Sequence, residues 1–556
     1  MKDTKTSVGI CSGLALLVAL STPTIFAQCD RFPQGSSVHE PENLYSKNGV
    51  LKVDLTYQTS PGEDGKPLYC FVNSDGSESP TLHVNPGDTL IINLTNLVPE
   101  GTGKMPNMPG MDLSKAGEGG CGAANVTSSS VNIHYHGTNT APVCHEDEVI
   151  HTVINSGQTF RYEVHFPKNE PPGLYWYHPH IHGISTTAVQ GGATGALIVE
   201  GIENVNPAVA GLPQRVIVVR DNPPVNPPPL HRPRGAAPLD SEAAADLSVN
   251  YIPIGGPAFI PAEFDMKPGE RQFWRIVNSA AVTILDLHLV YDGVDQPFEV
   301  ISLDGVPLGS QDGSGQGKSL TRHHLFIPPA GRAEVVVTGP PTGVQTAQLM
   351  TKRVYTGPGG DPDPTRPIFN IATSESGAAP ADVTMVPAIS GPRPQKRFSD
   401  LAEAAPTTTR LIYFSENAKF FFITVDGQTP RPYHMDDPPA ITTTQGAVED
   451  WTIENRSNEN HEFHIHQIHF LLMSRNGLPV ANYDKQILDT VNIPYWSGTG
   501  PYPSVTVRMD FRGPTVGDFV YHCHILDHED GGMMAIIRVL PKTPAVGKTE
   551  AAAAKL

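Results

Sequence analysis

The residues best suited to redox chemistry lie near the C-terminus, where a cysteine stands between two histidines. The string is His522-Cys523-His524, and His528 and Met533 follow it. A thiolate with two imidazoles and a weak axial thioether is the ligand set of a blue copper electron-transfer site. The string therefore predicts a mononuclear copper. Because the flanking histidines are covalently joined to the cysteine, this segment can carry electrons from that copper into a neighbouring metal cluster.

Eight histidines of the chain group into four separate pairs, and in each pair a single residue stands between the two histidines. They are His134 and His136, His178 and His180, His464 and His466, and His522 and His524. Successive side chains of a β-strand point to opposite faces, so both histidines of a pair share one face. Eight imidazoles suit three copper ions, two of them as a close pair. Imidazole also suits Zn, Fe and Ni, so the thiolate site is what names copper.

The same parity argument separates the thiolate site from the cluster. Cys523 faces away from both of its neighbours, and His461 has the opposite parity to His464. We therefore expect His461 and Cys523 to meet on one side, joined by His528 from the following loop.

One strand pattern occurs three times along the chain. In each copy a glycine turn is followed nine residues later by an asparagine that ends an alternating strand; the copies run from Gly87 to Asn96, Gly269 to Asn278, and Gly446 to Asn455. Spacings of 182 and 177 residues are those of domains rather than of a solenoid. The pattern predicts an all-β fold of three Greek-key β-sandwich domains in series.

Composition and motifs place the boundaries of these domains. The N-terminus has two lysines and then an apolar run, which is typical of a secretory signal and predicts a secreted or periplasmic protein. The second domain lacks a histidine pair and is predicted to be a spacer without copper ligands. The expected divisions are a signal peptide at 1–27, a first domain at 28–203, a second at 204–377, a Pro/Ala-rich linker at 378–409, a third domain at 410–543 and a disordered tail at 544–556.

Bulk composition narrows the class of protein. The 556 residues include 52 Gly and 54 Pro, only 17% are charged, and the net charge is -19. This balance favours short strands joined by turns, and the negative charge argues against a nucleic-acid partner. After the signal, no stretch is long enough to span a membrane. We expect a monomer.

Six cysteines are present, and two of them are assigned by the arguments above. Cys11 leaves with the signal peptide and Cys523 binds copper. The remaining four, Cys29, Cys70, Cys121 and Cys144, are expected to form two disulfides in an oxidising compartment. Three pairings are possible, and the sequence does not choose among them.

Together these motifs resemble those of the three-domain multicopper oxidases, in particular the laccase-like group. The matching strings are HYHG from His134, WYHPH ending at His180, HEFHIH from His461 and HCHILDHEDGGMM from His522. The resemblance implies cupredoxin-like domains and four copper ions. It places the type 1 copper on His461, Cys523, His528 and Met533, the type 2 copper on His134 and His464, and the type 3 pair on His136, His178, His180, His466, His522 and His524.

The resemblance also implies a reaction. Phenols or aromatic amines would give up one electron at a time, coupled to four-electron reduction of dioxygen to water. Oxidation of Cu(I), Fe(II) or Mn(II) is an alternative, which requires an acidic or methionine-lined pocket over the type 1 copper, and bilirubin-type substrates are another. The non-enzyme alternative is a scaffold for copper storage or protein interaction, which would be expected to have lost ligands.

Two acids are candidates for proton delivery. Glu529 follows a ligand directly and resembles the proton-delivering acid of the family, although a solvated acid on the ligand loop is an equal alternative. Asp147 is a weaker candidate near the type 2 copper, and an exposed turn is the favoured interpretation there.

His182 and His469 are expected to hydrogen-bond beside the ligands. Met105, Met108 and Met111 have the chemistry to bind Cu(I), but an ordinary Pro/Gly loop is favoured.

Overall fold

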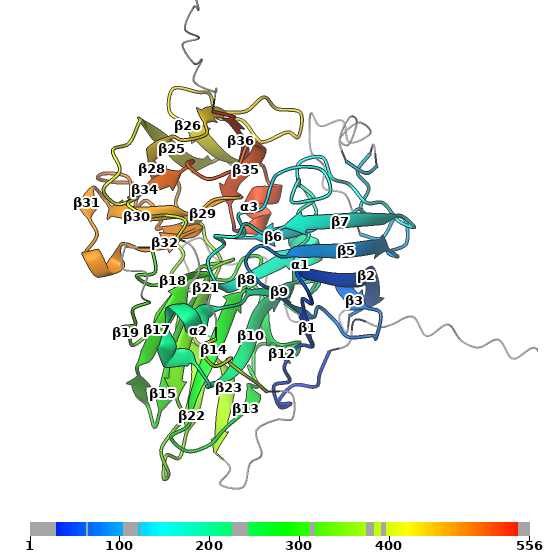
Figure 1. Ribbon diagram of the computed structural model, residues 1–556, viewed down its shortest axis with the longest axis vertical. Helices are drawn as coiled ribbons and strands as arrows, with labels where there is room; N and C mark the ends of the chain where they lie inside the picture. Colours follow the sequence, from blue (N-terminus) through cyan, green and yellow to red (C-terminus); the bar gives the residue numbers. More distant parts are fainter. Residues whose placement is uncertain are drawn as a thin grey trace, which may run out of the picture.

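In the part of the chain that the structure describes, strands dominate and form six sheets, which pair into three sandwiches (Figure 1). The computed structural model describes residues 29, 31–62, 65–103, 121–123, 125–224, 243–311, 317–373, 383–390 and 396–542. Within these ranges, no helix combines the length and the apolar character that crossing a membrane requires. The expected signal peptide and tail, and the methionines at 105, 108 and 111, lie outside the described residues.

The first sandwich, blue to cyan in Figure 1, consists of a four-stranded and a five-stranded sheet. The four-stranded sheet has the order β3 (Pro67–Asn73), β2 (Val50–Pro61), β5 (Thr89–Asn96), β7 (Thr159–His165). The five-stranded sheet has the order β1 (Asn43–Tyr45), β4 (Thr81–Val84), β9 (Gly195–Val199), β8 (Gly173–His178), β6 (His134–His136). The strand β6 therefore lies at a sheet edge, where its histidines can face another domain.

The second sandwich, green in Figure 1, contains the larger sheets. One has the order β12 (Ile252–Ile254), β11 (Asp246–Val249), β10 (Pro213–Asn222), β14 (Arg271–Asn278), β21 (Arg332–Thr338), β17 (Phe298–Leu303), β18 (Val306–Pro307), with β19 (Leu320–Arg322) on β17 and β24 (Thr384–Met385) on β10. The other has the order β13 (Ala262–Met266), β23 (Arg366–Thr373), β22 (Ala347–Thr351), β15 (Leu285–Tyr291), β16 (Val294–Gln296), with β20 (Leu325–Ile327) on β15.

The third sandwich, yellow to red, contains the cysteine strand. Its seven-stranded sheet has the order β26 (Phe421–Val425), β25 (Thr408–Glu416), β28 (Val448–Asn455), β34 (Ser504–Asp510), β30 (Phe470–Arg475), β31 (Leu478–Pro479), with β32 (Ile487–Leu488) on β30. Its five-stranded sheet has the order β27 (Ile441–Thr444), β36 (Met534–Leu540), β35 (Gly517–Cys523), β29 (His461–Ile465), β33 (Thr490–Ile493). The short helices are α1 (Ser185–Gln190), α2 (Ile202–Val205), α3 (Leu526–Asp530), η1 (Pro207–Val209) and η2 (Asn482–Asp484).

The predicted fold class, three β-sandwiches in series, is confirmed, and the repeat has a structural basis. Each repeat strand (β5, β14 and β28) lies between one parallel and one antiparallel partner in its sheet. The asparagines that end them, Asn96, Asn278 and Asn455, are fully buried. Each amide nitrogen donates to two backbone carbonyls, and each amide oxygen accepts a backbone N–H two residues later. The asparagine thus pins the chain where it leaves the strand, which explains why this residue type recurs.

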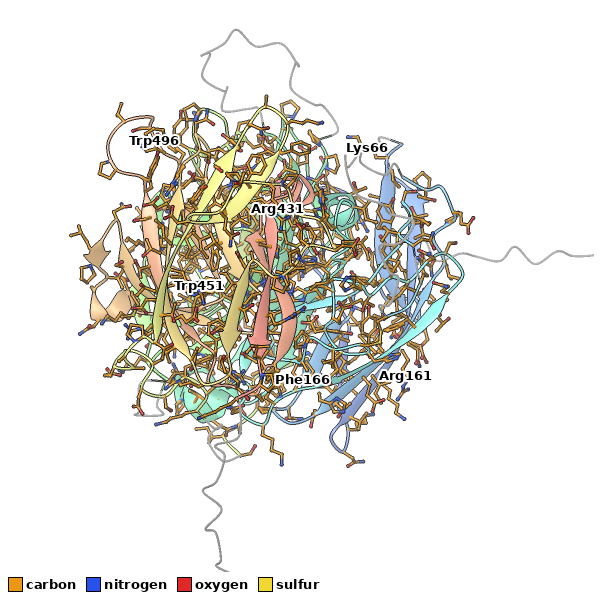
Figure 2. All side chains as sticks on the ribbon, turned by 90° about the horizontal axis from the view of Figure 1, so that it is seen from above. Lys66, Arg161, Phe166, Arg431, Trp451 and Trp496 are labelled. Atoms are coloured by element: carbon orange, nitrogen blue, oxygen red, sulfur yellow. A yellow bond between two sulfur atoms is a disulfide. The ribbon has the colours of Figure 1, made fainter. Side chains whose placement is uncertain are left out.

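Each sandwich has its own apolar core between its sheets. Trp451, labelled in Figure 2, is fully buried in the third core, and its indole N–H donates to Glu449 Oε2 at 2.8 Å. Cys523 and Met533 belong to this core as well. The thiolate site is therefore built into a packed interior, which holds its side chains in fixed positions.

The four cysteines with open pairing form two disulfides. They are Cys29–Cys70 and Cys121–Cys144, with Cα–Cα separations of 5.6 and 5.5 Å. Cys523 is the free cysteine of the described residues and is buried. The structure thus selects one of the three pairings that the sequence left open.

Candidate metal centre

Three side chains of the third domain converge on one point beside its core. His461 begins β29, Cys523 ends the adjacent antiparallel strand β35, and His528 lies in α3 just after it. The Cys523 sulfur is 3.6 Å from His461 Nδ1 and 3.8 Å from His528 Nδ1, and the two nitrogens are 3.0 Å apart. The structure therefore brings together the thiolate and the two imidazoles that the parity argument placed on one side.

Met533 lies next to this group, and its neighbour Met534 does not. The Cys523 N–H donates to the Met533 carbonyl at 3.0 Å, and the Met533 side chain is fully buried in the same apolar cluster as Cys523. Met534 packs in a separate cluster with Tyr433. The packing therefore agrees with Met533 as the thioether of the site.

The eight paired histidines come together between the first and third domains. The strand β6 pairs with β8 in the first domain, and β29 pairs with β35 in the third, so each strand pair brings its histidines together. Two groups of three form, and their nitrogens lie within 4.8 Å of one another: His136, His178 and His524, and His180, His466 and His522. His134 and His464 remain, and with His136 they form a further such group. Each group contains residues of both domains.

Hydrogen bonds orient several of these rings. His134 Nδ1 donates to Asp147 Oδ1 at 3.0 Å, and His464 Nδ1 donates to the Asp489 carbonyl at 2.9 Å. His178 and His522 donate in the same way to the carbonyls of the residues that follow them, both at 2.9 Å. A histidine that binds a metal through one nitrogen commonly donates its other N–H in this way.

The donor set fits copper ions. The buried Nε2 atoms of His134, His178 and His464 lack a hydrogen-bond partner among the described residues. Burial, reinforced by the neighbouring imidazoles, lowers the pKa of His134 well below its usual range. The rings are thus held neutral, which is the form that binds a metal. A buried nitrogen without a hydrogen-bond partner lowers the stability of the fold unless an ion or another group binds to it.

The buried Cys523 thiol also fits a metal cation. Cys523 is fully buried, and burial raises the pKa of its thiol well above the usual range. The Glu462 N–H points to the sulfur at 3.4 Å. A soft metal cation would reverse this shift, because a coordinating thiol is deprotonated outright. The residues therefore fit a copper ion held by Cys523, His461 and His528, with Met533 as the weak fourth ligand.

Comparison with known proteins agrees with this chemistry. Two family models, both described as multicopper oxidase, match residues 120–204 and 403–543. The two ranges contain every copper ligand predicted from the sequence. These two ranges are multicopper oxidase domains. The chain is an oxidase that uses dioxygen, and copper is its cofactor.

Three similar proteins share less than a quarter of their aligned residues with this chain. The Oryza sativa protein "Multicopper oxidase LPR1 homolog 5" is 24% identical over 423 residues, which are 68% of this chain and 62% of that protein. The Bacillus subtilis protein named laccase is 22% identical over 415 residues, which are 68% of this chain and 73% of that protein. A solved multicopper oxidase from Campylobacter jejuni, described as a metallo-oxidase, superimposes with a TM-score of 0.62 at 21% identity and covers 94% of this chain and 98% of that chain. The structural likeness shows that the folds agree.

Asp147 of this multicopper oxidase does not lie on an exposed turn, as the sequence favoured. Its side chain is fully buried and accepts from the Tyr135 N–H at 3.0 Å, from His134 and from the Gln467 amide at 2.6 Å. Burial raises the pKa of Asp147 well above its usual range. The prediction of an exposed turn rested on the acidic run Glu146-Asp147-Glu148. It was wrong because Gln467 of the third domain covers this loop.

Glu529 is also buried and not solvated. Its side chain lies in α3 of the third domain, and Oε1 is 3.1 Å from Nδ1 of His182 in the first domain. Burial raises the pKa of Glu529 to about 8. Asp530 beside it accepts the Gly183 N–H at 2.6 Å and the Thr186 N–H at 2.8 Å, so the α3 acids also join the two domains.

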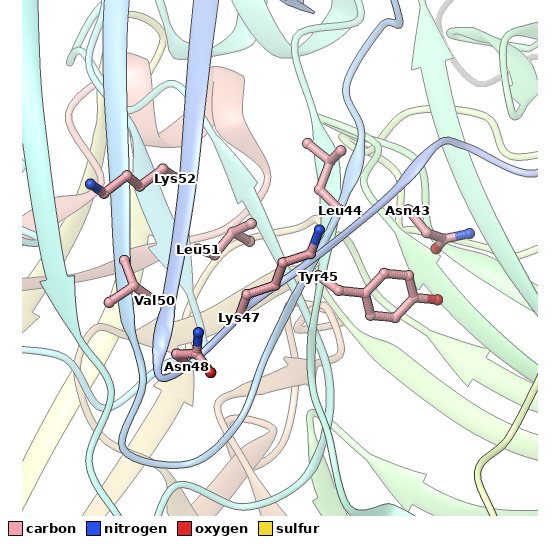
Figure 3. A pocket seen from close by; sticks show the side chains of 8 residues that line it. All are labelled: Asn43, Leu44, Tyr45, Lys47, Asn48, Val50, Leu51 and Lys52. Atoms are coloured by element: carbon pink, nitrogen blue, oxygen red, sulfur yellow. The ribbon is translucent and has the colours of Figure 1, made fainter.

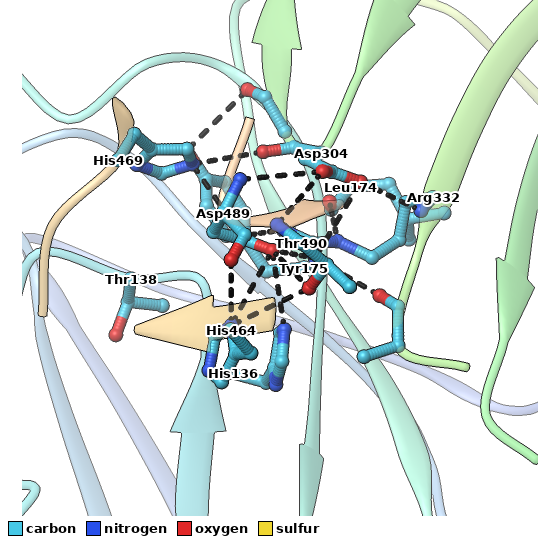
Figure 4. A network of polar contacts seen from close by, with 12 residues as sticks. His136, Thr138, Leu174, Tyr175, Asp304, Arg332, His464, His469, Asp489 and Thr490 are labelled. Atoms are coloured by element: carbon cyan, nitrogen blue, oxygen red, sulfur yellow. Dashed lines mark hydrogen bonds and ion pairs between the residues drawn. The ribbon is translucent and has the colours of Figure 1, made fainter. Parts of the chain in front are cut away.

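A third carboxylate, Asp489, contacts the cluster and was not predicted. It follows β32 and carries no recognisable motif, so only the folded chain reveals its place beside His136 and His464 (Figure 4). Although burial opposes ionisation, the Arg332 guanidinium holds the pKa of Asp489 below its usual range. His469, which was expected to hydrogen-bond near the ligands, donates from Nε2 to the Asp304 carbonyl at 2.9 Å.

Carboxylates also gather around His528. His461 is fully buried, whereas His528 is 6% exposed, so His528 offers the accessible edge of the thiolate site. His528 Nε2 is 3.4 Å from Glu459 Oε1 and 3.9 Å from Asp527 Oδ1. Burial and the adjoining Glu416 carboxylate raise the pKa of Glu459 to about 10. Like charges so close together favour protonation or a bound cation.

A large surface pocket lies away from these residues. It has a volume of about 680 Å³ and is lined by β1 and the start of β2, including Tyr45, Lys47 and Lys52 (Figure 3). None of its lining residues is a candidate copper ligand or contacts one in the described part of the chain. We therefore assign the redox chemistry to the buried imidazole cluster and the His528 edge.

Proposed function

We propose a specific distribution of ligands among three kinds of copper site. The type 1 site consists of His461, Cys523, His528 and Met533, and the type 2 site of His134 and His464. The type 3 pair consists of the two groups His136, His178 and His524, and His180, His466 and His522. The observation that carries this proposal is that the eight imidazoles include two groups of three that share no residue and leave His134 and His464 as a pair. Asp147 and Glu529 are proposed to deliver protons to the cluster.

The chain's own residues determine the path of the reaction. Bound copper supplies one-electron oxidation of the substrate and reduction of dioxygen to water. The His528 edge is the point at which a small reductant can approach, because His461 is fully buried. Cys523 is joined to His522 and His524 by peptide bonds. The shortest covalent path from the thiolate to a cluster ligand therefore runs along the backbone from Cys523 to either neighbour. Buried acids beside the cluster can hold and release protons without admitting bulk water.

Phenols and aromatic amines are the first candidate substrates. The likeness to the Bacillus subtilis protein named laccase supports them. A neutral or cationic aromatic molecule is compatible with a net charge of -19 and with the carboxylates at the His528 edge.

Metal cations are a second candidate, and a specific observation favours them. Glu459 and Asp527 lie 3.4 and 3.9 Å from His528 Nε2, and the charges of Asp361 and Glu416 act on the pKa of the His528 ring. Carboxylate oxygens suit Fe(II) and Mn(II) better than Cu(I), which prefers thioether and thiolate ligands. These carboxylates give the acidic surroundings that a metal oxidase would require, and the Campylobacter jejuni protein of the same fold is described as a metallo-oxidase.

Oxygen uptake with matched substrates separates these candidates. A phenolic dye, an aromatic amine, Fe(II), Mn(II) and Cu(I) would each be supplied to the copper-loaded wild type and to Glu459→Gln. A metal oxidase loses Fe(II) or Mn(II) oxidation in this variant and keeps dye oxidation; a phenol oxidase keeps its preference for the dye. Glu163→Gln is a matched control, since Glu163 pairs with Arg161 on the surface of the first domain. Uptake with none of the reductants would contradict the proposed oxidase function.

We also propose that the protein is exported. Two disulfides form among the described residues, and such bonds persist in oxidising compartments. Fractionation of the producing cell, with detection of the protein outside the cytoplasm, tests this proposal.

A further inference from the structure

Arg332 stands where the three domains meet. It begins β21 of the second domain and is fully buried. Its Nε donates to the Leu174 carbonyl of the first domain at 3.3 Å, and its two Nη atoms donate to the two Asp489 oxygens of the third domain at 2.8 and 2.5 Å (Figure 4). A bidentate pair of this kind fixes the carboxylate in orientation as well as in position.

Asp489 passes this orientation on to two candidate copper ligands. Its Oδ1 is 3.3 Å from His136 Nε2, and its backbone carbonyl accepts from His464 Nδ1 at 2.9 Å. The Nδ1 of His136 and the Nε2 of His464 are then the buried nitrogens that lack a hydrogen-bond partner among the described residues. One residue therefore directs a ligand of the first domain and a ligand of the third toward the cluster.

Asp304 of the second domain hydrogen-bonds to both Arg332 and Asp489. Asp304 Oδ1 accepts the Arg332 N–H at 2.9 Å, and Oδ2 lies 3.3 Å from the Asp489 N–H. Its backbone carbonyl accepts from His469 at 2.9 Å. Asp304 of the second domain thus holds the backbone of both residues of the Arg332–Asp489 ion pair in position.

The first domain is shaped to receive the pair. Gly137 follows His136 directly and has a φ of +82°. A β-carbon at this position would collide with the Arg332 guanidinium and the Asp489 carboxylate. The glycine of the HYHG string therefore leaves room for the ion pair next to a copper ligand.

We propose that Arg332 is a positioning residue of the copper cluster, which acts through Asp489 on the ring orientations of His136 and His464. The second domain then takes part in building the cluster and is more than the spacer that the sequence predicted. This inference rests on the proposed assignment of His136 and His464 as copper ligands. Removal of the guanidinium would leave a buried carboxylate without the partner that fixes its orientation, so that it could turn toward the cluster.

The test compares Arg332→Met, Arg332→Lys and a control in copper-loaded protein. The readouts are copper ions per chain, the blue thiolate absorption, and the electron paramagnetic resonance spectrum of the non-blue copper. We expect Arg332→Met to weaken copper binding at the cluster by about 10- to 100-fold and to alter the non-blue spectrum, while the blue absorption is unchanged. Arg332→Lys, which keeps the charge but not the bidentate geometry, should restore part of the copper affinity.

Arg275→Met is the matched control. Arg275 is equally buried in the same sheet and pairs with Glu334, and neither residue contacts a candidate copper ligand in the described structure. This variant should lose stability without a change in the non-blue spectrum. If Arg332→Met does not fold, Gly137→Ala displaces the same ion pair sterically and should give the same spectral change.

The outcomes distinguish this inference from the proposed function. Four copper ions and an unaltered non-blue spectrum in the Arg332 variants would overturn the positioning role and leave the ligand assignment intact. A change of the same size in Arg275→Met would show that loss of a buried arginine, and not the contact with Asp489, is responsible. Wild-type protein that holds no copper at the cluster would overturn the proposed function itself.

Discussion

His182 Nδ1 lies 3.1 Å from Glu529 Oε1, although the two residues are 347 positions apart and belong to different domains. Burial lowers the pKa of His182 to about 4 and raises the pKa of Glu529 to about 8. Near neutral pH the imidazole is therefore neutral and the carboxyl group holds its proton. His182 is also two residues from the candidate ligand His180, so the acid has a short route to the cluster.

The first prediction is that Glu529→Gln slows turnover and leaves the blue absorption intact. Glutamine keeps the size of the side chain but cannot release a proton. In the wild type, the protonated fraction of Glu529 falls as the pH rises through about 8, so the rate should fall there as well. The variant should lack this fall in rate at high pH. Steady-state kinetics from pH 5 to 9 measure it. An unchanged profile would remove Glu529 from the proton path.

The same group predicts a pH dependence of stability. The folded-state pKa is raised above the ordinary value of 4.5. The contribution of Glu529 to folding is therefore fully present below about pH 4.5 and is lost as the pH rises through about 8. Glu529→Gln lacks this loss, so its stability relative to the wild type should increase from pH 5 to pH 9. Thermal unfolding of the two metal-free proteins measures the difference, and a difference that is constant with pH would contradict the prediction.

Asp147→Asn is predicted to weaken the site of His134 and His464. The carboxylate accepts from His134 and is itself held by Gln467 of the third domain. Asparagine disturbs both contacts, so copper affinity there should fall by about 10- to 100-fold. Titration of metal-free protein with copper, followed by electron paramagnetic resonance, measures the loss. Glu148→Gln is the control, because the neighbouring Glu148 bonds only to His151 and Thr152 in the described structure.

The disulfide Cys121–Cys144 is predicted to stabilise the loop that carries Asp147. It closes a loop with a sequence separation of 23 residues. Replacement of both cysteines by serine should cost about 3 kcal/mol of unfolding free energy. Denaturant unfolding of the wild type and of the double variant, both without reductant, gives the comparison. Equal midpoints for the wild type and the double variant would show that the bond does not contribute to stability.

The sequence predicted the parts of this protein that depend on local order. Strand parity sorted Cys523 from His522 and His524, and the repeated glycine and asparagine predicted three sandwiches. Both follow from short-range geometry, which tertiary contacts do not alter.

The neighbours of the cluster depend on contacts between distant segments. Asp147 appeared exposed within an acidic run, but Gln467, 320 positions later, covers it. Asp489 and Arg332 carry no motif, and their importance arises only where three domains meet. The disulfide pairing was open for the same reason, since spacing along the chain does not fix which cysteines meet.

Copper stoichiometry measured together with visible absorption, in the wild type and in Cys523→Ser, tests the central claim most directly. The account predicts four copper ions per chain and a blue colour in the wild type. It predicts three copper ions and no blue colour in the variant, because serine removes the sulfur ligand and leaves the eight imidazoles in place. Colourless copper-loaded wild type, or a variant that stays blue, would contradict it.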